Sequence, residues 1–201
     1  MKLNVLGTIF GQTGYDIHTK NLVNALYNNG LKDISLEVPK PQNWPMMCND
    51  AEYNMLTNPY DTKETTLMIG LPPYWLFPLS ERPKNFIGFI VWEGDSIPKS
   101  WLPILAREDV SQLWVPSKHT AGAILETNLR ENNKYPNLYK KIRIISHGVD
   151  KTLFYPQPSK DKSSKFTFVA NKGWSQGMID RGGIQWVLKA FTEEFTSKDN
   201  V

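Results

Sequence analysis

Cysteine is almost absent from this sequence, since Cys48 is the only one in 201 residues. A single thiol cannot form an intrachain disulfide or build a zinc site on several thiolates. Long apolar runs are missing as well. No stretch approaches the roughly 18 residues of a membrane span, and the apolar run at the start is too short for a signal-peptide core. We therefore expect a cytoplasmic protein, at most peripheral to a membrane.

Motifs of several enzyme classes are also missing. The sequence has no Asp-x-Asp to carry a divalent metal, no Gly-x-Ser-x-Gly elbow and no His-Glu-x-x-His. Its three histidines, His18, His119 and His147, are too scattered to propose a metal site. The seven tryptophans lie mostly in strand and helix patterns, so core packing explains them better than nucleic-acid stacking. We expect no metal, no resident cofactor and no nucleic-acid partner.

The net charge of +3 is unevenly distributed. The segment from Arg130 to Lys165 contains nine Lys or Arg residues and three acids, which gives a local charge of +6. A solvated loop followed by a mobile linker explains this excess. Contact with an anionic membrane or a phosphorylated ligand is the alternative left open.

Apolar runs typical of strands alternate with segments of helical periodicity through residues 1–150. This alternation predicts an α/β fold, a Rossmann-like parallel sheet with helices on both faces and ligands at the carboxyl ends of its strands. The expected helices are Ile17–Asn28, one opened by Pro98 and one capped by Ser117. The expected strands are Lys2–Thr8, Ile34–Val38, Thr66–Gly70, Phe86–Trp92, Gln112–Val115 and Lys141–Ile145.

The pattern loosens after residue 150. Residues 151–165 are rich in Pro, Ser and Lys and are expected to form a linker. A strand at Lys165–Ala170 and a helix at Gly183–Phe195 follow. One strand and one helix cannot bury their own apolar faces, so residues 166–201 are expected to begin a second, truncated lobe. A small extra unit docked on the first lobe is the alternative.

The first candidate site is the loop Gly11-Gln12-Thr13-Gly14, which connects the first expected strand to the first helix. Glycines at a helix N-terminus let a ligand approach the backbone amides. The spacing lacks the third glycine of the dinucleotide fingerprint and the Lys of a P-loop. A plain tight turn is therefore an equal alternative. His18, one turn later, can face the same ligand or serve as a structural hydrogen-bonding group.

The second candidate site is Trp92-Glu93-Gly94-Asp95-Ser96, at the carboxyl end of the fourth expected strand. A carboxylate accepts charge-assisted hydrogen bonds from sugar hydroxyls, and Trp92 offers a flat apolar face for a sugar ring. We interpret Asp95 or Ser96 as the cap of the helix that Pro98 opens, and Glu93 as the functional carboxylate.

Two further segments precede expected helices. Ser117 is interpreted as an N-cap, and Lys118 and His119 on the first turn give a weak anion-binding signal. Lys172 and Arg181, with glycines before the last helix, indicate a stronger anion site in a βα turn.

In their order along the chain, these segments resemble the retaining glycosyltransferases of family 4, which have the GT-B fold. The resemblance covers nearly the whole chain. It rests on five ordered segments: Gly14-Tyr15-Asp16-Ile17-His18, Trp92-Glu93 with Ile97-Pro98 and Trp101, Leu113-Trp114-Val115-Pro116-Ser117, Ile144-Ile145-Ser146-His147-Gly148-Val149-Asp150, and Phe154-Tyr155-Pro156.

The resemblance implies transfer of a hexose from a nucleotide diphosphate sugar, a co-substrate, to a glycan or lipid-linked acceptor, with retention and without a metal. Residues 1–150 would be the acceptor-side lobe. His18, Trp92 and Glu93 would bind the acceptor. Gly14, Tyr15, Lys172 and Arg181 would bind the donor, with Arg181 neutralising the leaving diphosphate.

The sequence departs from the family pattern where Gly182 replaces the usual lysine, and the Glu-rich donor motif would lie beyond Val201. The chain by itself is therefore expected to catalyse nothing. The main alternative is a non-catalytic Rossmann-like binding module, which could pair as a homodimer through the incomplete second lobe. A different Rossmann-like enzyme is disfavoured by the missing third glycine.

Overall fold

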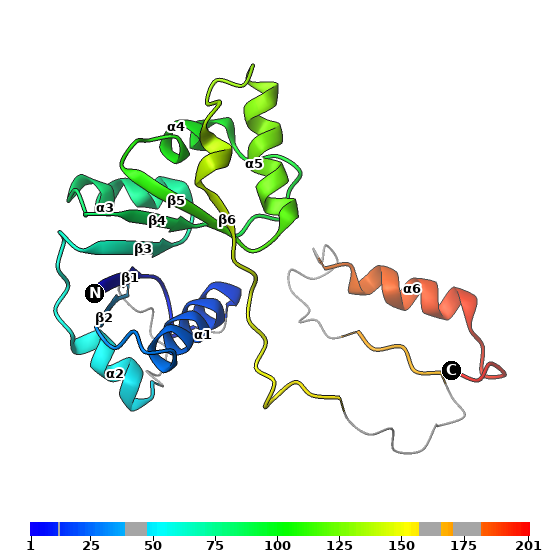
Figure 1. The fold of residues 1–201 in the computed structure, drawn as a ribbon. Coiled ribbons are helices and arrows are strands. Elements are labelled where there is room, and N and C mark those ends of the chain that lie inside the picture. The colour runs from blue at the N-terminus through cyan, green and yellow to red at the C-terminus, as the bar shows by residue number, and fades with distance from the viewer. Residues whose placement is uncertain (12, 39–47, 157–165, 171–181) are drawn as a thin grey trace. The chain divides into compact units, whose positions relative to one another are not determined.

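The computed structural model describes residues 1–11, 13–38, 48–156, 166–170 and 182–201. Contacts divide the chain into two compact units, Met1–Val149 and Asp150–Val201. The first unit carries the sheet, and the second contains one described helix (Figure 1).

Six strands of the first unit form one sheet in the order β2-β1-β3-β4-β5-β6, and every neighbouring pair is parallel. This confirms the predicted α/β, Rossmann-like arrangement. Each strand expected within residues 1–150 is present. Strand β4 ends at Phe89 rather than Trp92, so the residues from Ile90 onward form a loop. The strands are β1 (Leu3–Leu6), β2 (Ile34–Glu37), β3 (Thr65–Ile69), β4 (Phe86–Phe89), β5 (Val110–Val115) and β6 (Ile142–Ile144).

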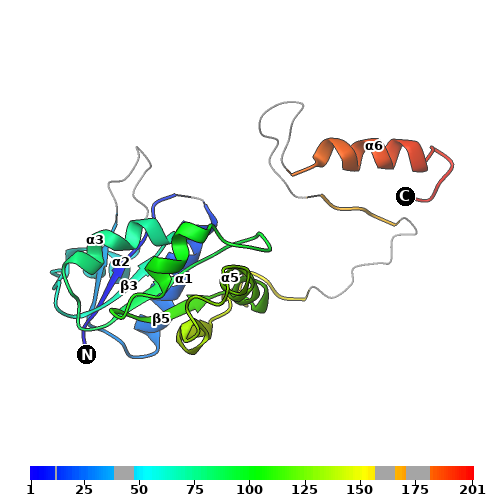
Figure 2. The same ribbon diagram turned by 90° about the horizontal axis from the view of Figure 1, so that it is seen from above.

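Helices cover both faces of this sheet: α1 and α2 lie on one face, and α3, α4 and α5 lie on the other (Figure 1). The view from above shows the second layer over the strands (Figure 2). Sequence patterns predicted α1, α4 and α5 but not α2 or α3. The helices are α1 (Gly14–Asn28), α2 (Asp50–Thr57), α3 (Leu76–Ser80), α4 (Leu102–Leu105) and α5 (Lys118–Arg130), with short 3-10 turns η1 (Pro72–Trp75), η2 (Lys99–Trp101) and η3 (Leu138–Lys141).

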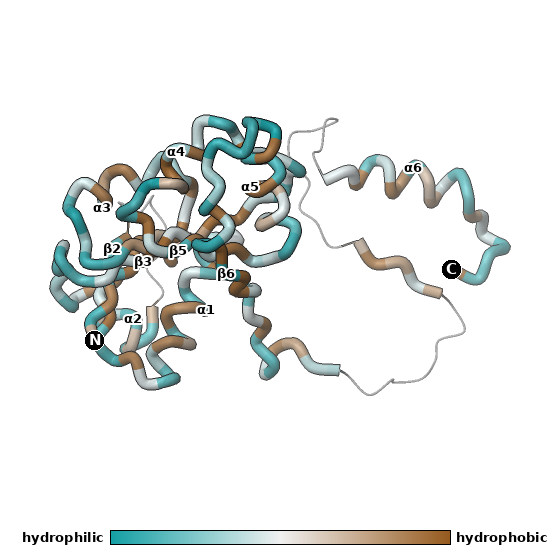
Figure 3. The backbone as a smooth tube through the Cα atoms, turned by 45° about the horizontal axis from the view of Figure 1, so that its top comes forward, coloured by the Kyte–Doolittle hydropathy of each residue, from teal (hydrophilic) through white to brown (hydrophobic). Residues whose placement is uncertain are grey.

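Each face of the sheet has its own hydrophobic core, and strand alternation divides the side chains between the two. In β4, Phe86 belongs to the cluster under α3, α4 and α5, whereas Phe89 belongs to the cluster under α1 and α2. Side chains three positions apart on a strand point to opposite faces. Hydrophobic colour accordingly follows the central strands (Figure 3).

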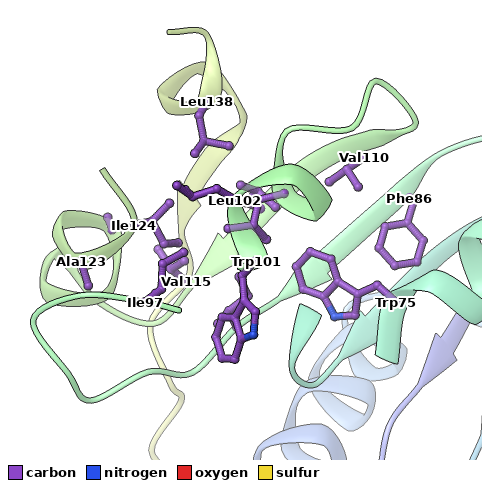
Figure 4. Packing of buried hydrophobic residues seen from close by; sticks show 14 of the residues in the cluster. Trp75, Phe86, Ile97, Trp101, Leu102, Val110, Val115, Ala123, Ile124 and Leu138 are labelled. Atoms are coloured by element: carbon purple, nitrogen blue, oxygen red, sulfur yellow. The ribbon is translucent and has the colours of Figure 1, made fainter. Parts of the chain in front are cut away.

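Trp75 anchors the core under α3 (Figure 4). Its side chain is fully buried and packs on Phe86 with ring centroids 5.7 Å apart. The indole nitrogen donates a hydrogen bond to the Gly70 carbonyl at 3.0 Å. A Cβ placed on Gly88 of β4 would lie 2.1 Å from this indole, so the tryptophan occupies the space that a side chain at residue 88 would need.

The expected N-cap of α5 is confirmed, and so is the end of α1 that the Asn29-Gly30 pair predicts. Ser117 caps α5, because its hydroxyl accepts the Thr120 amide at 3.2 Å. Gly30 follows α1 with a φ of 102°, a left-handed conformation that favours glycine.

Helical periodicity in the sequence predicts an apolar inner face for α1 made of Ile17, Leu22, Val23, Ala25 and Leu26, and this prediction is partly wrong. Ile17 is 54% exposed, and Ala25 is exposed too. The buried side chains of α1 are Asp16, His18, Thr19 and Val23. Polar groups can take these inner positions because Asp16, His18 and Thr19 each make hydrogen bonds there, which offset the loss of water.

In the second unit, α6 (Ile184–Glu194) confirms the last expected helix. Phe168 packs against Phe191 and Phe195, at centroid distances of 5.8 and 5.3 Å. The strand expected at Lys165–Ala170 is not observed in its described part, residues 166–170. A strand needs a hydrogen-bonded partner, and the backbone bond shown for this segment joins the Phe166 amide to Asn200 alone. No residue of α6 is buried.

Candidate functional site

The parallel sheet brings several loops to one edge, because each of them follows the carboxyl end of a strand. We call this the carboxyl-edge site: Gly11–His18 after β1, Val91–Glu93 after β4, Ser117–His119 after β5, and His147 after β6. Side-chain contacts join these segments, as the following pairs show.

Asp16 organises the loop between β1 and α1. Its carboxylate is 5% exposed and accepts the amides of Gly11 at 3.0 Å and Thr13 at 3.1 Å, together with the Thr13 hydroxyl. Burial alone would raise the pKa of Asp16, but hydrogen bonds from Thr13, Gly11 and Thr8 outweigh it and lower the pKa. Thr13 in turn accepts the Asp16 amide, which completes a capping box at the start of α1.

The two described glycines of this loop have different roles. A Cβ on Gly11 would lie 2.5 Å from the Asp16 carboxylate, so this glycine is required by the loop itself. A Cβ on Gly14 would meet nothing within 4 Å. Among the described residues, none accepts a hydrogen bond from the amides of Gly14 and Tyr15, which head α1. Packing therefore does not require glycine at residue 14.

This difference yields a matched pair of variants. Gly11→Ala should lower the free energy of unfolding by about 1–2 kcal/mol, because the Asp16 carboxylate must move and lose hydrogen bonds. Gly14→Ala should leave that free energy within about 0.5 kcal/mol. Urea unfolding followed by circular dichroism measures both, and equal losses would contradict the assignment of Gly11 to the loop and Gly14 to open surface.

Tyr15 connects α1 to the end of β4. Its hydroxyl donates a hydrogen bond to the Val91 carbonyl at 3.2 Å. Burial raises the pKa of Tyr15, the hydrogen bond to Val91 lowers it, and the negative charge of Glu93 raises it further. The net shift is upward, so the phenol stays protonated and can act as a donor. Tyr15 was predicted to bind the sugar-nucleotide donor, but its hydroxyl already makes a hydrogen bond within the protein.

His18 is the most unusual group of the site. Its ring is 8% exposed, lies 4.3 Å from the Phe89 centroid, and has its Nδ1 2.9 Å from the Nδ1 of His147. Its Nε2 is buried and has no hydrogen-bond partner among the residues that the structure describes. Burial, and then the charge of His147, lower the pKa of His18 from 6.5 to about 4. His18 is therefore neutral near pH 7.

Trp92 has a structural role that its sequence position did not reveal. The indole nitrogen donates to the Ser96 carbonyl at 2.8 Å, and the ring meets Trp101 edge-on at 4.9 Å. These contacts close the turn that displays Glu93 and Asp95, both of which are exposed.

Neither Asp95 nor Ser96 caps the following helix, so that expectation is wrong. The 3-10 turn η2 begins after Pro98 without any side-chain cap. The reason is that the cap position falls on Pro98, two residues beyond Ser96, and proline has no side-chain acceptor.

The first turn of α5 fastens the same loop. Nε2 of His119 lies 3.0 Å from the Glu93 carbonyl oxygen, and the Thr120 hydroxyl donates to the Trp92 carbonyl at 3.1 Å. The backbone of Glu93 is therefore fixed while its carboxylate remains at the surface. Asp16, Thr120 and the partner of His18, His147, were not among the predicted site residues. Only Asp16 carried a local signal, since Thr13 and Asp16 have capping-box spacing.

The remaining donor-binding predictions, Lys172 and Arg181, lie outside the described residues. The structure thus brings Gly14, Tyr15, His18, Trp92 and Glu93 to one edge of the sheet and places neither of the two basic residues.

A pocket of about 310 Å³ lies elsewhere, between the ends of α1 and α2 and the start of β2. Lys32 and Asn58 are among its lining residues, and Lys32 sits 3.7 Å over the ring of Tyr27. This is the amino edge of the sheet, opposite the carboxyl-edge site. We favour the carboxyl edge as the functional site, because the buried, unpartnered His18 nitrogen and the shifted pKa values of Tyr15 and His18 occur there.

Within the described ranges, no three His, Cys, Asp or Glu side chains converge as metal ligands. In the same ranges, no helix has the length and apolarity needed to cross a bilayer.

Comparison of the sequence with models of known protein families produced no match. Comparison with curated proteins produced none either.

Proposed function

We propose that this chain carries the acceptor-binding lobe of a retaining glycosyltransferase of the GT-B type. The reaction would transfer a sugar from a nucleotide diphosphate sugar to a glycan or lipid-linked acceptor, without a metal. The observation that carries the proposal is the convergence of α1's open first turn, the exposed Glu93 carboxylate and the buried neutral imidazole of His18 at the carboxyl edge of a parallel sheet.

Each group suits one part of such a substrate. The exposed carboxylate of Glu93 can accept hydrogen bonds from two neighbouring sugar hydroxyls, and its backbone is already held by His119. The free amides of Gly14 and Tyr15 lie at the positive end of the α1 dipole, which favours phosphate oxygens. The Asp16 carboxylate already takes the amides of Gly11 and Thr13, so these two are not available to a ligand.

A neutral His18 supports the proposal in a further way. A neutral imidazole has one ring nitrogen without a hydrogen, which can accept a hydrogen bond, whereas an imidazolium offers only donors. Burial lowers the pKa of His18 to about 4, so the ring is uncharged near neutral pH.

Glu93 provides the test of the proposal. We expect the chain to bind members of a panel of oligosaccharides and lipid-linked saccharides, and Glu93→Gln to weaken that binding by about tenfold or more, as loss of a charge-assisted hydrogen bond predicts. Isothermal titration calorimetry measures the affinity. Glu108→Gln is the matched control, because Glu108 is equally exposed but precedes β5 at the amino edge.

Because the chain by itself is expected to catalyse nothing, transfer from labelled nucleotide sugars is assayed after the missing second lobe has been supplied, with and without a chelator. Binding that Glu93→Gln and Glu108→Gln reduce equally, or the absence of saccharide binding together with the absence of transfer, would contradict the proposal.

A further inference from the structure

His18 and His147 form a side-chain pair across 129 residues of sequence. Their Nδ1 atoms are 2.9 Å apart, and the rings meet edge-on with centroids separated by 4.5 Å at 80°. Two nitrogens can approach this closely only when one carries a hydrogen and the other presents a lone pair. The pair therefore shares one proton along the Nδ1–Nδ1 line.

The surroundings decide which ring donates. If His147 donated, neutral His18 would carry its own hydrogen on Nε2, which is buried and has no acceptor. Orphaned buried N–H groups are rare, and an unfilled lone pair is better tolerated. If His18 donates, the hydrogen on Nε2 of His147 points to water, because His147 is exposed. The second arrangement leaves no buried donor unsatisfied.

We propose that His147 is a positioning residue, which holds His18 in its Nδ1–H tautomer and so makes the Nε2 of His18 an uncharged hydrogen-bond acceptor. The ring is fixed from two sides, by His147 at Nδ1 and by Phe89 at 4.3 Å from its centroid. Nε2 has no exposed surface in this structure, so a substrate hydroxyl can reach it only if the groups that cover it move on binding. That step rests on the proposed function, whereas the role of His147 itself does not.

No other charged group competes for this task among the described neighbours of His18. Phe89, which packs on the ring, does not titrate. On α1, the Tyr15 hydroxyl is bound to Val91 and the Asp16 carboxylate to the loop before the helix. The charge of His147 is the one shown to act on His18.

The test is the position of the ring hydrogen in the 201-residue chain, read by long-range ¹H–¹⁵N NMR of the histidine side chains. Only three histidines contribute signals. His119 is an internal reference, since its Nε2 faces the Glu93 carbonyl oxygen and must carry the hydrogen there. Just above neutral pH we expect His18 to be protonated at Nδ1 and bare at Nε2.

Two variants at the exposed residue 147 complete the test without endangering the core. His147→Leu removes the acceptor, and the major tautomer of His18 should invert to the Nε2–H form that a free imidazole prefers. His147→Asn offers an amide oxygen near the same place and should preserve the Nδ1–H form. The reference signal of His119 should not move in either variant.

A wild-type His18 that carries its hydrogen on Nε2, or a tautomer that His147→Leu leaves unchanged, would overturn the proposal. The ligand step is separable from it. If the tautomer inverts as expected while saccharides neither bind nor shift the His18 nitrogens, the proposed function fails and the role of His147 is supported.

Discussion

Gly88→Ala is expected to lower the free energy of unfolding by about 3 kcal/mol, the upper range for overpacking a core. The new methyl carbon would lie 2.1 Å from the six-membered ring of Trp75. The indole cannot swing aside cheaply, because it is fully buried, packs on Phe86 and donates a hydrogen bond to the Gly70 carbonyl. Urea unfolding followed by tryptophan fluorescence and circular dichroism measures the loss.

The control for this change is Gly122→Ala, on the exposed side of α5, where an added Cβ meets nothing within 4 Å. Alanine is the better helix former, so this variant should gain about 0.5–1 kcal/mol. If both variants changed stability in the same direction, the packing of Trp75 against β4 described above would be wrong.

His18→Phe is expected to abolish much of the acid sensitivity of folding. The pKa of His18 is about 4 in the folded protein against 6.5 for the ordinary group, so above pH 6.5 both states are neutral and stability is complete. As pH falls from 6.5 to 4, the unfolded chain binds a proton that the folded chain does not. The wild type should thus lose roughly 3 kcal/mol over this window, at about 1.4 kcal/mol per pH unit.

At pH 7 the same variant should unfold within about 1 kcal/mol of the wild type. The phenyl ring can pack on Phe89, and it removes a buried nitrogen that has no partner. The exposed ring of His147 can bond to water instead. The measurement is the difference in unfolding free energy between variant and wild type at pH 7, 5.5 and 4, in which the carboxylates common to both proteins cancel. A difference independent of pH would contradict the assignment of His18 as buried and neutral.

The sheet could be predicted from sequence because its signals are local. Each strand is a short apolar run, and the turns between them carry Gly, Pro and Asn, so the alternation of strands and helices was legible without tertiary information. The end of β4 was not legible. Ile90 and Val91 continue the apolar pattern, but the pairing with β3 and β5 stops at Phe89 and turns Trp92 into a loop residue.

Helices α2 and α1 show two different limits of prediction from sequence. α2 carries a readable start, since Asn49 and Glu52 form a capping box, but the proline-rich segment before it obscured the pattern. The inner face of α1 could be read only in part, since Val23 is buried but Ile17 is not. Its first turns bury Asp16, which is bound to the loop before the helix, and His18, which is bound to His147 after β6. Apolar periodicity therefore indicates the wrong residues as the buried ones.

The candidate site was predicted in its members but not in its connections. Gly14, His18 and Glu93 were chosen from their places after strands, and parallel topology does bring those places together. The contacts that give them their properties are long-range: His18 with His147, and the Glu93 carbonyl with His119. No sequence pattern predicts a contact between residues 129 positions apart, because the contact forms only once the sheet is assembled.

The location of the functional site is the central claim, and chemical-shift mapping with a bound saccharide tests it most directly. Titration of the isotope-labelled chain with a saccharide from the binding panel should produce saturable shifts in the ring nitrogens of His18 and in the amides of Gly14, Tyr15 and Glu93. The amides of Tyr27, Lys32 and Asn58, which line the pocket at the opposite edge, should stay unchanged. Saturable shifts confined to those three residues would contradict the account.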